Sequence, residues 1–301
     1  MRNVALFVSA VLMVLLAFSA DAIEKNKNQK PVVSVSILPQ KYFVEQISGD
    51  FLKVNVILPP GSSPEDYEPT PKQLIDVSGS KFFFYVGHLG FERTWLNKLI
   101  DVAPKVSYVS CSKGIDLLEE GNIHDSGEPT PKSHNYGTDP HIWTSPENVK
   151  KMCRTICSQL SVAYPAQKKT FESNLTTFIA KVDTLDTHIR SVLNDSINTS
   201  FMIYHPALGY YARDYHLIQY PLEYDGKEPS TSHMKQLVDV ARKKNIHTIL
   251  IQSQFETSKA QVIAKEIGAQ IVPIDPLAEN WLAEMYSLTD KMKVALAKKG
   301  R

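Results

Sequence analysis

Side chains that can bind a metal ion recur in this sequence just after short apolar runs. Glu65 follows one run within a Pro-rich loop, His88 comes two residues after another, and His205 and Asp275 each end a further run. His141 lies in a loop ahead of a probable helix. Because ligands of open α/β sheets bind beyond the carboxyl ends of the strands, we expect these side chains to gather at one edge of the sheets. Imidazole with carboxylate suits Zn²⁺, and more carboxylate favours Mn²⁺.

Each of these residues is a weak signal by itself. A single His in a loop is more often a surface hydrogen-bonding group than a ligand, and Asp before Pro is common in turns. It is the shared position after predicted strands that favours a metal site.

The apolar pattern alternates between strand and helix on both sides of a long helical stretch. The predicted strands are 32–38, 51–58, 82–86 and 105–111 in the first half, and 200–205, 217–222, 246–251 and 269–274 in the second. Helices are expected at 39–48, 70–78 and 146–162, and later at 207–214, 230–243, 258–267 and 280–297. Such alternation is typical of parallel sheets with helices on both faces.

A single helix is expected over residues 166–193, a stretch without Pro or Gly whose apolar residues keep helical spacing. At 1.5 Å per residue it would be about 42 Å long, enough to run the length of a two-domain protein. The predicted fold is therefore α/β, with two βα lobes (23–164 and 197–301), each a small parallel sheet flanked by helices, joined by one long linking helix (165–196).

The first 22 residues have the features of a signal peptide. A basic start at Arg2 precedes an apolar run over residues 4–18 and the small-residue site Ala20-Asp21-Ala22. The run is short for a membrane anchor, so we expect cleavage after Ala22 and export of the mature protein to the periplasm. No Cys lies at that site, so a lipid anchor is not expected.

The charge composition argues against some classes of binding partner. The 33 basic and 32 acidic residues give a net charge of +1, which argues against nucleic acid or an anionic membrane as the main partner. Cys111, Cys153 and Cys157 are odd in number, so they form no complete disulfide framework and are interpreted as buried apolar residues.

Six segments, in order and spacing, resemble the metal-specific solute-binding proteins of ABC importers, the zinc and manganese receptors of the TroA-like superfamily. They are GSSPEDYEPTP (61–71), GFERTW (90–95), DPHIWTSP (139–146), HPALGYY (205–211), GKEPS (226–230) and DPL (275–277). The resemblance covers nearly all of the mature chain. It implies a monomeric periplasmic receptor, not an enzyme, that holds one metal ion in the cleft between the lobes and delivers it to a permease in the cytoplasmic membrane.

The resemblance implies His141, His205 and Asp275 as three of four ligands, and a His at position 205 is the pattern of the zinc branch, so Zn²⁺ is the expected metal and Mn²⁺ the alternative. The family usually has Pro-His where this chain has Pro64-Glu65. Three outcomes stay open: Glu65 binds the metal, His88 replaces the missing imidazole, or water completes a site of three protein ligands. Asp139, Glu68, Tyr67 and Glu223 are candidates to support the ligands.

The family's His-rich loop corresponds to residues 119–136, which hold only two His and are expected to be a solvated loop. A zinc hydrolase and an adhesin are the competing functions. No H-E-x-x-H or nucleophile motif supports a hydrolase, and adhesion would not need a tightly bound metal. The long helix predicts small loop movements on metal release.

Overall fold

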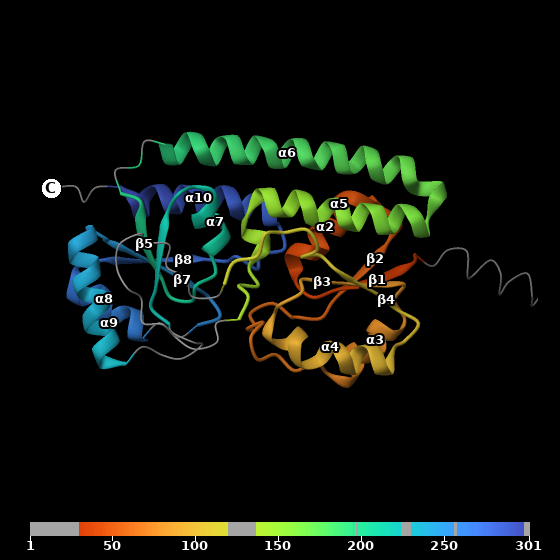
Figure 1. The fold of residues 1–301 in the computed structure, drawn as a ribbon, viewed down its shortest axis with the longest axis horizontal. Coiled ribbons are helices and arrows are strands. Elements are labelled where there is room, and N and C mark those ends of the chain that lie inside the picture. Colours follow the sequence, from red (N-terminus) through yellow and green to blue (C-terminus); the bar gives the residue numbers. More distant parts are fainter. Residues whose placement is uncertain are drawn as a thin grey trace, which may run out of the picture.

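Two lobes lie side by side beneath one long helix in the computed structural model (Figure 1), which describes residues 30–119, 137–194, 196, 198–223, 230–255 and 258–297. Each lobe contains a four-stranded sheet. The predicted architecture of two βα lobes and a linking helix is confirmed, while the exact lobe boundaries stay predictions. The signal peptide and most of the loop 119–136 lie outside the described residues.

The first lobe has the strand order β2-β1-β3-β4, and all neighbouring strands are parallel. Its central strands are apolar and buried on both faces, as the interior of a parallel sheet requires. The strands are β1 (Val32–Val35), β2 (Lys53–Val56), β3 (Phe82–Tyr85) and β4 (Ser107–Ser110), and the helices are α2 (Leu38–Ser48), α3 (Pro71–Ser78) and α4 (Gly90–Val102).

The second lobe repeats this topology, with the parallel order β6-β5-β7-β8. Pro221 and Pro273 lie on the edge strands β6 and β8, where a missing N–H is tolerated. The strands are β5 (Ser200–Ile203), β6 (Ile218–Pro221), β7 (Thr248–Gln252) and β8 (Gln270–Ile274), and the helices are α7 (Gly209–Asp214), α8 (Thr231–Lys244), α9 (Ser258–Ile267) and α10 (Trp281–Leu296).

The linking helix α6 (Lys168–Asn194) has 27 residues and extends over both lobes, with α5 (Pro146–Ala163) beside it (Figure 1). It packs on α5 and α2 of the first lobe and on α10 of the second. The helix was predicted to begin at residue 166, but a short 3₁₀ helix, Pro165–Gln167, precedes it. The face turned to the protein is apolar, with Phe171, Phe178, Val182, Leu185, Ile189 and Leu193 buried.

One hydrophobic core joins the two lobes. The Trp281 ring of α10 lies 5.4 Å from the Phe43 ring of α2 and 6.4 Å from the Phe178 ring of α6. The Trp281 indole N–H donates to the carbonyl of Trp143 (2.8 Å), and the Trp143 indole donates to the carbonyl of Pro276 (2.7 Å). Because these contacts are buried and cross from lobe to lobe, the lobes are fixed relative to each other.

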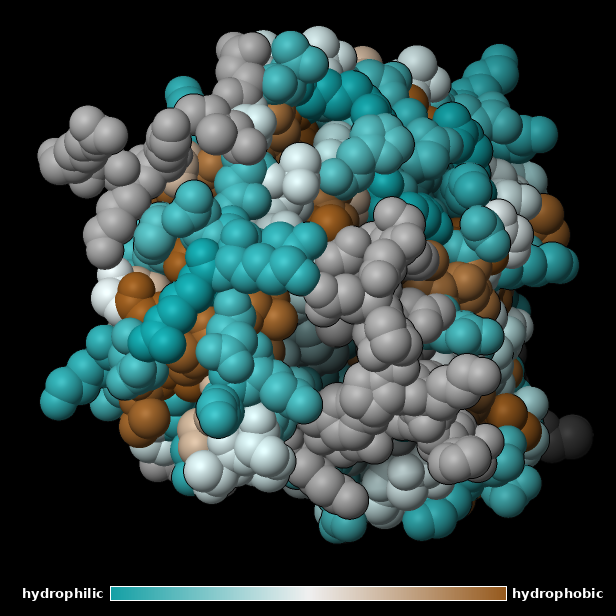
Figure 2. All heavy atoms as spheres, turned by 60° about the vertical axis from the view of Figure 1, so that its left-hand side comes forward, coloured by the Kyte–Doolittle hydropathy of each residue, from teal (hydrophilic) through white to brown (hydrophobic). Residues whose placement is uncertain are grey.

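Outside this core, hydrophilic residues cover much of the face in Figure 2, with small hydrophobic patches between them. The exposed large apolar residues are scattered, with Ile75 on α3, Val162 on α5, Val262 on α9 and Val294 on α10. Among the described residues, no helix is both long and apolar enough for a membrane span. The described structure has Cys111, Cys153 and Cys157 buried and without a disulfide bond. Burial raises the pKa of the Cys111 thiol to about 12.

Candidate metal centre

Three side chains from three separate loops converge where the lobes meet. Glu65 comes from the loop after β2, His141 precedes the short 3₁₀ helix Ile142–Thr144, and His205 follows β5. One possible ligand atom from each lies within 4.8 Å of the other two. Across the described ranges, no other group of three His, Cys, Asp or Glu side chains meets that criterion.

A buried carboxylate holds each imidazole from behind. The Nδ1 atom of His141 lies 2.8 Å from Asp139 Oδ1, and Nδ1 of His205 lies 2.9 Å from Glu223 Oε2. Both carboxylates belong to buried residues. A carboxylate behind Nδ1 favours the tautomer with its proton on Nδ1, which directs the Nε2 lone pair to a cation. This is the arrangement that orients metal-binding histidines in proteins.

The two Nε2 atoms are 3.3 Å apart. At that separation the two nitrogens can share one proton or bind one cation between them. Two nitrogens bound at about 2.0–2.1 Å to one tetrahedral Zn²⁺ would be about 3.4 Å apart. The imidazole pair therefore has the spacing of one edge of a tetrahedral zinc site.

Glu65 completes the group with an oxygen that has no hydrogen-bond donor among the described residues. Its Oε1 atom is buried and accepts no hydrogen bond from the described residues, and it lies 4.0 Å from Nε2 of His205. A buried carboxylate oxygen without a partner is costly in free energy. A bound cation would remove that cost, so this orphaned oxygen also fits a metal site.

The cavity at this group is small. Its volume is about 20 Å³, and its lining includes His141, His205, Trp143, Phe255 and Pro276. A water molecule needs roughly 10–15 Å³ by this kind of measure, so there is room for a single water-sized particle. The Phe255 ring stacks on the His205 ring, with centroids 4.9 Å apart and planes inclined by 17°. The site therefore fits one ion rather than an organic molecule.

Sequence reasoning missed several residues that position the ligands. The Gln252 side chain at the end of β7 donates to the His205 carbonyl (2.8 Å) and accepts from the His205 main-chain N–H (3.4 Å). Tyr210 donates its hydroxyl to the carbonyl of Asp139 (2.8 Å). A Cβ on Gly209 would lie 2.4 Å from Asp139 Oδ2, so that approach requires glycine. Gln252 does follow an apolar run, but an amide is not an expected zinc ligand.

The other two predicted ligands lie outside the three-residue group. Asp275 accepts from the main-chain N–H of Leu277 through Oδ1 (3.2 Å), and its own N–H donates to Glu284 (3.1 Å). Its neighbour Pro276 does line the cavity. His88 is half-buried, and burial together with the nearby Arg93 cation lowers the pKa of its imidazole. Of the supporting candidates, Asp139 and Glu223 contact ligands, whereas Glu68 is exposed.

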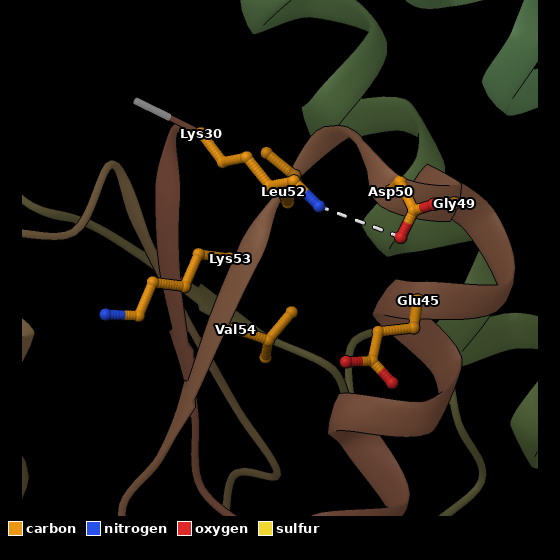
Figure 3. A pocket seen from close by; sticks show the side chains of 7 residues that line it. All are labelled: Lys30, Glu45, Gly49, Asp50, Leu52, Lys53 and Val54. Atoms are coloured by element: carbon orange, nitrogen blue, oxygen red, sulfur yellow. Dashed lines mark ion pairs between the residues drawn. The ribbon is translucent and has the colours of Figure 1, made fainter. Parts of the chain in front are cut away.

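A second, larger hollow lies near the amino ends of β1 and β2 (Figure 3). It measures about 620 Å³ and is lined by Lys30, Glu45, Gly49, Asp50, Leu52, Lys53 and Val54. Lys30 and Asp50 form an ion pair across it at 3.7 Å, and the Asp50 side chain is fully exposed. Its charges are mixed and solvated, so it lacks the converging ligands of the metal centre.

Comparison with known proteins gives consistent results. The family model described as "Zinc-uptake complex component A periplasmic" matches residues 33–295. The high-affinity zinc uptake system protein ZnuA of Bacillus subtilis (strain 168) is 30% identical over 282 residues, covering 90% of this chain and 88% of that protein. A crystal structure of ZnuA superposes with a TM-score of 0.83 at 36% identity, covering 89% of this chain and 100% of that chain.

The zinc-binding lipoprotein AdcA of Streptococcus pneumoniae (strain ATCC BAA-255 / R6) is 28% identical over 285 residues, covering 92% of this chain. The matched region is only 56% of AdcA, so the chain spans little more than half the length of that relative.

Proposed function

The chain belongs to the family of the periplasmic component A of zinc-uptake complexes, and on that premise we propose that it captures one Zn²⁺ ion outside the cytoplasm and hands it to the permease of an ABC importer. The observation that carries this proposal is the imidazole pair, whose Nε2 atoms lie 3.3 Å apart, the spacing of two nitrogens on one tetrahedral Zn²⁺. Carboxylates behind both rings hold the His side chains ready for a cation.

We assign four ligands to the ion: His141, His205, Glu65 and Asp275. The first three already converge, and Glu65 Oε1 has only to move inward, because 4.0 Å exceeds a tetrahedral edge of about 3.4 Å. Asp275 would approach by a change in the short loop that contains Pro276, which already borders the cavity. His88 is not part of this proposed set.

A binding function is favoured over catalysis. A catalytic zinc keeps an open coordination position for water and substrate. The cavity of about 20 Å³ leaves no space for an organic substrate beside the ion. We therefore propose a receptor rather than an enzyme, and one that takes the metal as a single ion free of organic chelators.

Metal release is proposed to occur by loop movement. The lobes share one core through Phe43, Phe178 and Trp281, so a wide hinge opening would break many buried contacts. Rotation of the Glu65 side chain and a local shift at Asp275 would leave the ring contacts of that core in place. X-ray scattering of metal-free and zinc-bound protein should give nearly the same radius of gyration, and a large change would contradict loop-limited release.

The test of the proposed function is the metal content of the purified mature protein, measured by mass spectrometry. One zinc per chain is expected in the wild type and in His88→Ala, with loss of stoichiometric zinc in Glu65→Ala. Manganese in place of zinc, or no metal at all, would contradict the zinc-receptor function. Loss in His88→Ala and retention in Glu65→Ala would contradict the ligand assignment alone.

Export and partner binding are tested separately. We propose that residues 1–22 direct export and are removed after Ala22, so amino-terminal sequencing of the secreted protein should begin at Ile23. The receptor is proposed to act as a monomer, and light scattering of the purified protein should give the mass of one chain. A stable dimer would contradict that part of the proposal.

A further inference from the structure

Glu65 differs from the two histidines in how it is held. His141 and His205 each donate through Nδ1 to a carboxylate, whereas no described residue hydrogen-bonds to Glu65 Oε1. The position of this side chain must therefore come from its backbone. The structure shows which element contacts that backbone.

The first turn of α4 lies directly against the loop that carries Glu65. The Phe91 main-chain N–H donates to the carbonyl of Pro64 at 3.0 Å. The Phe91 ring packs edge-on against the ring of Tyr67, with centroids 6.2 Å apart and planes at 89°. These two contacts hold the loop on both sides of Glu65.

Gly90 makes the closest of these approaches. A Cβ atom built on Gly90 would lie 2.0 Å from the carbonyl oxygen of Glu65 and 2.7 Å from its Cα. These are backbone atoms, which cannot rotate away as a flexible side chain would. Any larger residue at position 90 must therefore displace either the Glu65 backbone or the start of α4.

Glu92 anchors this turn to the sheet. The buried carboxylate accepts from the main-chain N–H groups of Val86 (2.7 Å), Gly87 (2.7 Å) and Leu89 (3.4 Å). It also accepts from the hydroxyl of Ser36, which follows β1. The carboxylate thus ties the start of α4 to the ends of β1 and β3, and so gives the turn a fixed position relative to the metal centre.

We infer that residues 90–92, here named the α4 clamp, are positioning residues for the metal: they place the Glu65 backbone so that its carboxylate faces the imidazole pair. This inference rests on the proposed function, because it assumes that Glu65 binds the ion. The clamp contacts the loop at the backbone of Pro64 and Glu65 and at the ring of Tyr67. It acts on affinity only through Glu65.

The test is a double-mutant cycle on the zinc dissociation constant, measured by competition with a chelator of known affinity. Gly90→Ala should weaken zinc binding by about tenfold or more, the range known for lost support of a ligand. In a Glu65→Ala background the same Gly90→Ala change should alter the constant by less than about twofold, because there is no ligand left to misplace. A general structural defect would instead weaken binding by the same factor in both backgrounds.

Gly79→Ala is the matched control. It lies in the same lobe after α3, where an added Cβ would meet its nearest atom at 3.7 Å, an ordinary contact, so zinc affinity should be unchanged. If Gly90→Ala does not fold by circular dichroism, Tyr67→Leu replaces it in the cycle. That variant removes the half-buried ring that packs on Phe91 and keeps an apolar side chain there, and it should show the same dependence on Glu65.

Equal losses in both backgrounds, or an unchanged affinity in folded Gly90→Ala, would overturn the inference. A Glu65→Ala variant that binds zinc as tightly as the wild type would overturn it as well. The proposed receptor function would then still stand, because the wild type binds zinc. A wild-type protein that binds no zinc would refute both.

Discussion

The imidazoles and the carboxylate of the candidate metal centre are held in opposite ways. In the second lobe, His205 is fixed by Glu223 at Nδ1, by Gln252 at its backbone and by the stacked ring of Phe255. In the first lobe, the Glu65 side chain has no hydrogen-bonding partner among the described residues at its buried Oε1. The difference indicates that the imidazole side is rigid before the ion arrives and that the carboxylate side adjusts to it. A receptor that must release its metal benefits from such a division.

The largest effect on zinc affinity should come from removing one of the two imidazoles. His205→Ala removes a ligand, and the remaining groups cannot close around the ion, so zinc affinity should fall by about a thousandfold, or roughly 4 kcal/mol. Isothermal titration with chelator competition measures this. His88→Ala is the control and should bind as the wild type does. A loss below about tenfold in His205→Ala would contradict the assignment of His205 as a ligand.

A smaller loss is expected when the support of that histidine is weakened. Glu223→Gln keeps the shape of the side chain but replaces the anionic acceptor of the Nδ1 proton with a neutral amide. Zinc affinity should fall by about tenfold to a hundredfold. Glu266→Gln, an exposed residue paired with Arg242 on the surface, is the control. Equal affinities for both variants would show that the carboxylate does not hold the ring.

Lower pH should weaken zinc binding through the two imidazoles. Imidazole binds zinc only when neutral, so affinity should decline as pH falls from 7.5 to 5.5, with protons competing for both His ligands. Glu65→Ala should bind more weakly at every pH but keep a similar slope, because both imidazoles remain in that variant. A zinc affinity that does not change with pH would contradict the assignment of the histidines as ligands. If the pH dependence disappeared in Glu65→Ala, it would come from Glu65 and not from the imidazoles.

The smallest effect concerns the rate of release. Phe255→Leu removes the ring that covers His205 while keeping an apolar side chain. We expect zinc to dissociate a few times faster in stopped-flow chelation, with little change in the thermal midpoint. Trp95→Leu, on the first-lobe helix α4 and outside the residues that line the cavity, should leave the rate unchanged. Slower release in Phe255→Leu would mean that the ring does not shield the site.

Much of this organisation was predictable because it depends on local pattern. The alternation of apolar runs, the absence of Pro and Gly over 166–193, and the residues that follow each strand are all visible in the chain. They predicted both lobes and the linking helix, and they placed Glu65, His141 and His205 among five candidate metal-binding residues. Each of these features follows from the period of apolar residues and from the rule that ligands gather beyond strand ends.

The choice between Glu65 and His88 was different, because both follow strands of the same lobe. Only tertiary structure brings the Pro64-Glu65 peptide against Gly90 and sets the carboxylate beside the imidazoles. The roles of Gln252 and Gly209 were equally hidden. Their partners are far away along the chain, and a distance between two loops is decided by how the lobes pack, not by the residues of either loop alone.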